Sequence, residues 1–317
     1  MATGSLHPLS TRGELLPFKD DFYLWSYVPS IPAAAVFLIL FLALSILHTW
    51  KMYRKRMWFC LPFVIGGYLE AIGYVGRIAA NKATDQLGPY VIQSVLLLIP
   101  PSLFAASIYM TLGRVIRNLG ARAESCLFIT VRWLTTIFVV GDVFAFLVQG
   151  GGAGFMAAGS DPKMGEIIVV VGLAIQILFF GVFVAAAVSF QMRYRHQDPA
   201  PQSDFSWTSV FKRGQEAGCG QVPWRSMMNM LYAVSILILA RCIFRIIEYV
   251  MGADAYLLSH EWTLYVFDGV LMAAAMAIFY VYYPSTIGKT QDLEQMDTLD
   301  VGESIEMSNY NSTKPQG

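Results

Sequence analysis

Residues 165–190 read GEIIVVVGLAIQILFFGVFVAAAVSF, and beyond Glu166 this run holds no charged side chain. A helix needs about 20 mostly apolar residues to cross the roughly 30 Å hydrocarbon core of a bilayer. The run therefore predicts a transmembrane helix. Six further segments meet the same criterion, so we expect an all-α, polytopic membrane protein with seven transmembrane helices. The predicted spans are 29–49, 59–79, 89–112, 128–150, 165–190, 229–251 and 262–283.

The composition agrees with a chain whose solvent is lipid. Hydrophobic residues make up 56% of the chain and charged residues 14%, whereas soluble proteins carry about 25% charged residues. The formal net charge is zero, so no positive field suggests a nucleic-acid partner. The four cysteines form no CxxC pair, and we interpret them as ordinary thiols rather than a disulfide framework or a zinc site.

Lysine and arginine residues in the connections predict the orientation of the helices. The first, third and fifth connections hold twelve of them, whereas the second, fourth and sixth hold only Lys82 and Lys163. Because connections rich in lysine and arginine stay in the cytosol, we expect the N-terminus outside and the C-terminus in the cytosol. The predicted domains are an extracellular tail over 1–28, a seven-helix membrane domain over 29–284 and a polar, disordered cytosolic tail over 285–317.

Polar and ionisable side chains inside the predicted spans are the most informative residues. Each charged group costs at least about 2.5–3.5 kcal/mol at a helix centre, so each needs a partner or a wet cavity. Glu70 and Arg77 are seven residues apart, which places them on one face of the second span. Arg241, Arg245 and Glu248 share a face of the sixth span by the same rule. The candidate residues of a substrate or translocation path are Glu70, Tyr74, Arg77, Gln93, Asp142, Gln149, Gln176, Arg241, Arg245, Glu248 and Asp268.

Two interpretations of these residues stay open. Acids and arginines nearly balance, which favours a paired network in the bundle interior, with a polar cavity that opens toward the outer half. A functional path is the default reading of intramembrane charges. The same network is also compatible with a structural clamp that fixes the order of the helices, and the three glutamines with interhelical hydrogen bonding alone.

Proline and glycine mark two special places. Pro100 and Pro101 lie in the middle of the third span, where they should kink the helix and free backbone carbonyls. This kink is either a hinge or cavity wall, or a fixed bend. The run Gly150-Gly151-Gly152, with Gly154, is expected to stop the fourth span on the outer side and to begin a flexible loop. The alternative is a close contact between this backbone and a substrate.

Several kinds of chemistry lack their sequence motifs. The sequence Gly288-Lys289-Thr290 lacks the earlier glycine of a P-loop. The span 262–283 has no lysine to attach retinal, and the chain has neither an HExxH nor a GxSxG motif. We therefore expect no enzyme, no cofactor and no metal site.

Motifs in successive spans resemble a known family. They are Glu70-x-x-Gly73-Tyr74-x-x-Arg77, Pro100-Pro101-x-x-Phe104-Ala105-Ala106-x-x-Tyr109, Asp142-Val143-x-x-Phe146-x-x-Gln149-Gly150, Arg241-x-x-Phe244-Arg245-x-x-Glu248 and Glu261-x-x-x-Tyr265-x-x-Asp268. In this order the chain resembles the fungal RTA-like family of lipid-translocating exporters. The resemblance implies a multi-pass membrane protein, often of the plasma membrane, with relatives linked to release of sphingoid long-chain bases, resistance to toxic amphipaths and movement of porphyrins.

The function that the sequence favours is export or transbilayer translocation of a lipid or amphipathic small molecule. We expect the acids to hold a cationic headgroup and the arginines to balance the negative charge of these acids. The acids are Glu70, Asp142, Glu248 and Asp268. Glu70, near the middle of its span, is the candidate to carry a proton. The alternative is a seven-helix receptor or stress-signalling membrane protein, and a membrane-embedded lipid enzyme is disfavoured. The expected partners are the bilayer and its amphipathic substrate.

Overall fold

The protein is an all-helical bundle in a computed structural model, which describes residues 29–81, 84, 87–119, 123, 130–157, 162–197, 224–251 and 261–283. Seven helical segments in these ranges are long and apolar enough to cross a membrane, which confirms the predicted number of spans. Both predicted tails, 1–28 and 285–317, lie outside the described residues. The orientation of the bundle in the membrane stays a prediction.

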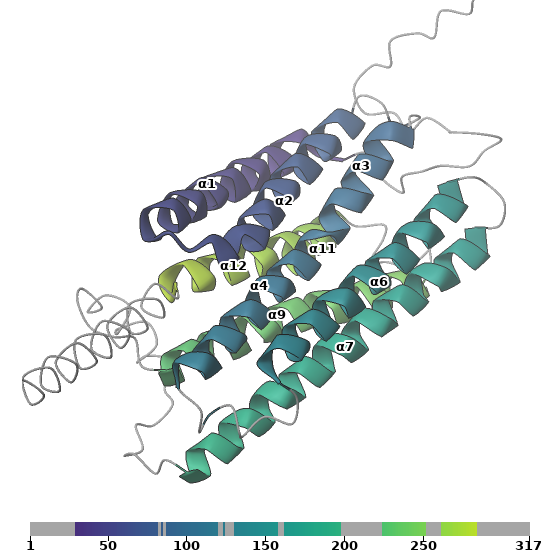
Figure 1. The fold of residues 1–317 in the computed structure, drawn as a ribbon. Helices are drawn as coiled ribbons and strands as arrows, with labels where there is room; N and C mark the ends of the chain where they lie inside the picture. Colours follow the sequence, from purple (N-terminus) through teal and green to yellow (C-terminus); the bar gives the residue numbers. More distant parts are fainter. Residues whose placement is uncertain are drawn as a thin grey trace, which may run out of the picture.

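In the described ranges, the seven spans are built from eleven helical elements. Figure 1 shows how they are arranged. The second span joins η1 to α2, the third joins α3 to α4, and the seventh joins α11, the π-helical turn η2 and α12. The bounds are α1 Ile31–Lys55, η1 Trp58–Cys60, α2 Leu61–Ala80, α3 Leu87–Leu98, α4 Pro100–Asn118, α6 Val131–Ala157, α7 Pro162–Gln197, α9 Trp224–Met251, α11 Glu261–Leu264, η2 Tyr265–Val270 and α12 Leu271–Val281.

The helices pack as a closed ring with α4 inside it. Around the ring, α1 contacts α2, α2 contacts α3, and α3 contacts α6. Helix α6 then contacts α7, α7 contacts α9, α9 contacts α12, and α12 contacts α1. In Figure 1, α1 and α2 lie on one side, α6 and α7 form a long pair on the other, and α4 runs between them. Helix α4 touches α2, α6, α7 and α9, and its span is the most buried of the seven. The buried polar side chains of α4, Ser107, Tyr109 and Thr111, are therefore placed at the centre of the bundle.

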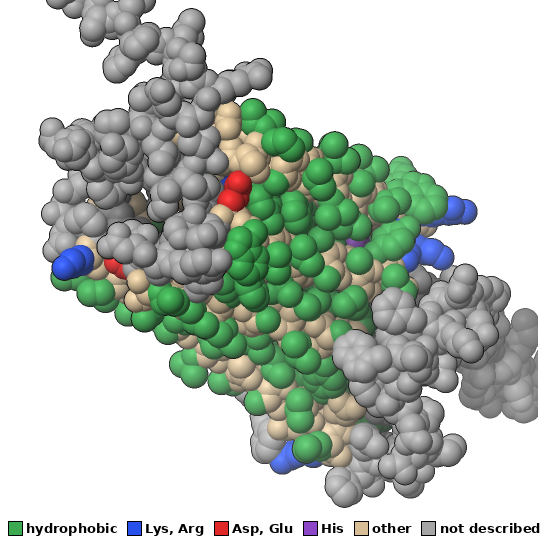
Figure 2. Space-filling view, turned by 180° about the vertical axis from the view of Figure 1, so that it is seen from behind, with side chains coloured by type: hydrophobic (Ala, Val, Ile, Leu, Met, Phe, Trp, Pro, Cys, Tyr) green, Lys and Arg blue, Asp and Glu red, His purple; other side chains and the backbone are tan. Residues whose placement is uncertain are grey.

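The outer surface of the bundle is apolar, as a lipid solvent requires. Figure 2 shows a face covered mostly by hydrophobic side chains, with the visible charged groups toward the two ends. Ile72 and Val75 on α2, each 48% exposed, belong to this outer surface, whereas Tyr74 between them is buried. The same helix therefore exposes aliphatic side chains to lipid and buries a tyrosine in the bundle interior.

The third span is interrupted at the position where Pro100 and Pro101 predict a kink. Helix α3 ends at Leu98 and α4 begins at Pro100, with a bend at Ile99 between them. Proline has no backbone N–H, so Pro101 donates nothing to the carbonyl of Leu97 four residues earlier. Beyond the bend, Ser102 donates to the Ile99 carbonyl instead (3.1 Å). The kink therefore leaves the Leu97 carbonyl available to a partner from another helix.

The prediction that the glycine run ends the fourth span is wrong. Helix α6 continues through these glycines to Ala157. A Cβ atom on Gly152 would lie 2.7 Å from the backbone oxygen of Gly165 in α7, and one on Gly172 would lie 3.0 Å from that of Ala145 in α6. Small residues let membrane helices approach closely. Gly152 and Gly172 serve the packing of α6 against α7, whereas nothing lies within 4 Å of an added Cβ atom at Gly150 or Gly151. The sequence alone does not distinguish this use of glycine from a loop.

Candidate functional site

The eleven candidate residues face the interior of the bundle. Ten of them are buried, with Arg77 and Tyr74 fully so, and the Arg245 side chain is 15% exposed. The expectation that these side chains avoid lipid is therefore confirmed. Whether they line a path for a substrate stays a prediction.

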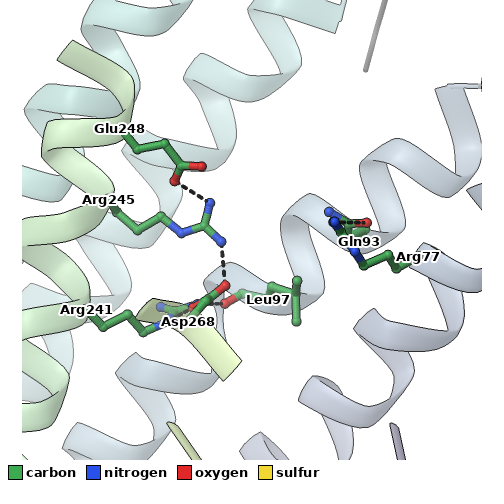
Figure 3. A network of polar contacts seen from close by, with 7 residues as sticks. All are labelled: Arg77, Gln93, Leu97, Arg241, Arg245, Glu248 and Asp268. Atoms are coloured by element: carbon green, nitrogen blue, oxygen red, sulfur yellow. Dashed lines mark hydrogen bonds and ion pairs between the residues drawn. The ribbon is translucent and has the colours of Figure 1, made fainter. Parts of the chain in front are cut away.

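The first group of contacts is a chain of charges between the sixth and seventh spans (Figure 3). Asp268 in η2 accepts from Arg241 and, at 2.5 Å, from Arg245, both in α9. Arg245 also binds Glu248 at 3.0 Å, one turn along α9. Arg241 further donates to the Leu97 carbonyl at the end of α3. The carbonyl freed by the proline kink thus receives a buried arginine, which links the third, sixth and seventh spans.

The π-helical turn η2 positions the acid of this chain. Asp268 and Gly269 both lie in η2 and are buried. A Cβ atom on Gly269 would lie 2.6 Å from the Phe37 ring and 2.7 Å from the Tyr74 hydroxyl oxygen. The turn therefore packs directly against α1 and α2, which only a glycine permits at that place. Such π-helical insertions occur frequently at functional sites.

The second group surrounds Arg77, which is fully buried in α2. Its Nη2 atom binds Glu261 at 2.9 Å, Nε donates to the Tyr265 hydroxyl at 3.1 Å, and Nη1 donates to Gln93 at 3.3 Å. Glu261 also accepts from the Tyr265 hydroxyl and from the backbone N–H of Ser30, which precedes α1. Arg77 therefore takes its acid from the seventh span rather than from Glu70 on its own helix.

A third group links the third, fourth and fifth spans. The Tyr109 hydroxyl in α4 donates to Asp142 in α6 at 2.9 Å. Two turns along α6, Gln149 donates to Gln176 in α7 at 2.9 Å, and Gln176 donates to the Ser102 hydroxyl in α4 at 3.1 Å. Among the described residues, this group contains no arginine or lysine. Unlike the other two groups, it therefore holds an acid, Asp142, without a positive charge.

Glu70 occupies the space next to the charge chain of α9 and η2. It is 1% exposed, and it lies close enough to Asp268, Arg241 and Arg245 to interact with them electrostatically. Its Oε1 atom has no hydrogen-bond partner among the described residues. An acid in this position can exchange partners with Asp268 or accept a donor from a bound molecule.

Aromatic rings form one wall beside Glu70 and Arg77. Tyr74 stacks on Phe37 and Phe41 with ring centroids 5.5 and 5.6 Å apart, and Tyr265 stacks on Phe37 at 5.1 Å. The Arg77 guanidinium lies 5.1 Å from the Tyr265 ring centroid. Stacked, buried aromatic rings and buried charge therefore lie side by side in the bundle interior, a combination that suits a molecule with an apolar body and a polar head.

Sequence reasoning missed several partners of this site. Glu261 lies just before the predicted start of the seventh span, although it precedes Tyr265 by four and Asp268 by seven residues, the spacing of one helix face. Tyr109 was part of the family motif, but nothing in its spacing identified Asp142 as its partner. Within the described part of the chain, no three histidine, cysteine or acidic side chains gather in a way that could hold a metal ion.

The fold and these contacts together define a multi-pass helical membrane protein whose charged and polar groups are paired inside a seven-helix bundle. Residues 63–291 match the model of the family described as RTA1 like protein, which covers more than half of the chain. The chain belongs to this family of fungal membrane proteins.

Curated relatives come from Saccharomyces cerevisiae. The chain is 31% identical over 297 residues to Protoporphyrin uptake protein 1, with 83% of this chain and 92% of the relative covered. It is 36% identical over 241 residues to Protein RTM1, with 75% and 72% covered. It is 25% identical over 300 residues to Sphingoid long-chain base transporter RSB1, with 87% and 78% covered. No solved structure matches the chain.

Proposed function

We propose that this protein moves an amphipathic small molecule or lipid across the membrane, and that the space around Glu70 receives the polar head of that molecule. The observation that carries the proposal is a buried carboxylate oxygen without a partner, set between a pair of arginines and a wall of aromatic rings. The names of two relatives, a protoporphyrin uptake protein and a long-chain base transporter, support transport of molecules of this kind.

The contacts narrow the acids that suit a cationic headgroup. Asp268 and Glu248 are bound to arginines, so an amine would have to displace a buried guanidinium to reach them. Glu70 Oε1 and Asp142 Oδ1 have no such competitor in direct contact, but the Asp142 carboxylate is already held by the Tyr109 hydroxyl. We therefore assign the headgroup of the transported molecule to Glu70. The ion pairs of Arg241 and Arg245 then have a structural role, because they hold the sixth and seventh spans in place around Glu70.

The proposal includes the orientation and the compartment. An outward N-terminus follows from the distribution of lysine and arginine in the connections, and the family resemblance favours the plasma membrane. In that orientation Arg77, Gln93 and Glu261 lie toward the outer side of the bundle, and a polar cavity between Glu70 and that side would be the exit for an exported molecule.

The test is flux of a fluorescent long-chain amine through the purified protein in proteoliposomes. We expect the wild type to move the probe faster than empty liposomes, and Glu70→Gln to lose most of this flux. Glu166→Gln is the matched control, because it makes the same chemical change in α7 outside the buried contacts described above. Flux equal to that of empty liposomes in the wild type would overturn the proposal.

A further inference from the structure

Asp142 differs from the other buried acids because, among the described residues, no arginine or lysine is bound to it or acts on it electrostatically. Each buried arginine of the described spans is bound to an acid, with Arg77 on Glu261 and the two arginines of α9 on Asp268. Among the described residues, the Asp142 carboxylate has a single hydrogen-bond partner, the neutral hydroxyl of Tyr109. The Oδ1 atom has none, although the residue is only 2% exposed.

The surroundings of Asp142 are apolar. Its partner Tyr109 packs against Phe183 and Phe138, with ring centroids 4.3 and 5.6 Å apart. An ionised carboxylate without a compensating charge in such surroundings is very costly, and the group is neutralised instead. The arrangement therefore requires either a proton or a bound cation at Asp142.

The groups that face Asp142 favour a proton over a metal ion. Helix α4 contributes the Tyr109 hydroxyl, and α9 contributes the thiol of Cys242, which interacts with Asp142 electrostatically. Helix α7 contributes phenyl rings such as Phe183 at this level, and α3 carries no acidic or basic side chain. Hard metal cations need about six oxygen ligands, whereas a proton needs one free oxygen atom.

We infer that Asp142 is a proton-binding site that exchanges its proton during transport, an inference that rests on the proposed function. The proton binds Oδ1, the atom without a partner, and Oδ2 continues to accept from the Tyr109 hydroxyl. Release of the proton returns the carboxylate, which the thiol and hydroxyl alone stabilise poorly. The site is therefore distinct from Glu70, whose neighbours include two arginines.

The proton itself is tested by infrared spectroscopy of the purified protein in lipid nanodiscs. We expect a carbonyl stretch of a protonated carboxyl group that Asp142→Asn removes and that Tyr109→Phe displaces, since the latter variant loses the hydrogen bond to Oδ2. Glu248→Gln, which removes an arginine-bound acid, should keep the band. Should Asp142→Asn fail to fold, Asp142→Glu must move the band. A spectrum without a band that depends on residue 142 would overturn the inference.

Coupling is tested with a pH difference across proteoliposomes at zero membrane potential. A difference of one pH unit is worth about a factor of ten in accumulated substrate for each proton exchanged. The probe here is a long-chain quaternary ammonium ion, which cannot lose a proton and so cannot follow the pH difference as a neutral amine. We expect the wild type to approach this ratio by exchanging one proton for one probe ion, and Asp142→Asn to fall to one.

The two proposals fail in different ways. Flux by the wild type with no response to pH and no band from Asp142 would refute the inference and leave the transport function standing. A band that depends on Asp142 without any flux would refute the transport function and the exchange of the proton during it.

Discussion

Asp268 binds two guanidinium groups at once, so removal of its charge is the sharpest test of the buried network. In Asp268→Asn the side chain keeps its size, but Arg241 loses its acidic partner and Arg245 keeps only Glu248. Removing one partner of a buried ion pair typically costs about 3–5 kcal/mol. Because two arginines are affected and the Arg241 side chain is only 3% exposed, we expect a loss in the free energy of unfolding of about 4–5 kcal/mol.

The matched control is Glu248→Gln in the same network. Arg245 keeps Asp268 in this variant, so no arginine is left without an acid, and we expect a smaller loss of about 1–2 kcal/mol. The assay is denaturant unfolding of both purified variants in one detergent, with the folded fraction followed by gel filtration. Equal losses in the two variants, or a loss below about 1 kcal/mol in Asp268→Asn, would refute the description of a desolvated charge chain.

Three further predictions concern the helix seam, the kink and the orientation. Gly152→Leu should lower thermal stability, because the new side chain would meet the α7 backbone. Gly154→Leu should change it little, since nothing lies within 4 Å of an added Cβ atom there. Thermal aggregation curves of the two variants check this prediction, and equal curves would contradict it. Pro101→Ala restores a backbone N–H that competes with Arg241 for the Leu97 carbonyl. We therefore expect slower flux of the probe in the proteoliposome assay. Unchanged flux would show that the kink has no part in transport. A cysteine in place of Lys55, in a background without other cysteines, should react with an impermeant maleimide only after cells are permeabilised, and labelling of intact cells would reverse the predicted orientation.

Hydropathy and helical periodicity predicted the spans and the inward-facing residues. Seven apolar runs require seven helices, because lipid leaves backbone groups no other partner. The spacing of seven residues placed Glu70 and Arg77 on one face, and both are buried. The prediction of the kink also followed from local chemistry, since a proline removes a backbone donor wherever it stands in a helix.

The pairing of these residues could not be predicted from the sequence. Arg77 binds Glu261, 184 residues away along the chain, and Arg241 reaches across to the backbone of Leu97. Periodicity reports the face of a helix but not the neighbour that the face meets. The glycine run of α6 failed for a related reason, because glycine suits both a loop and a close helix contact, and only the position of α7 decides between them.

The central claim is that the polar interior of the bundle, rather than its lipid-facing surface, receives the transported molecule. The most direct measurement is photo-crosslinking of the reconstituted protein with a long-chain amine that carries a photoreactive group next to the amine, followed by mass spectrometric mapping. Two neighbouring residues of α2 distinguish the two outcomes, because Tyr74 is buried in the bundle interior and Val75 is 48% exposed on the lipid-facing surface. We predict adducts on Tyr74 and Tyr265 that an excess of unlabelled amine removes. Adducts confined to Val75 and other lipid-facing residues, and unaffected by competitor, would contradict the account.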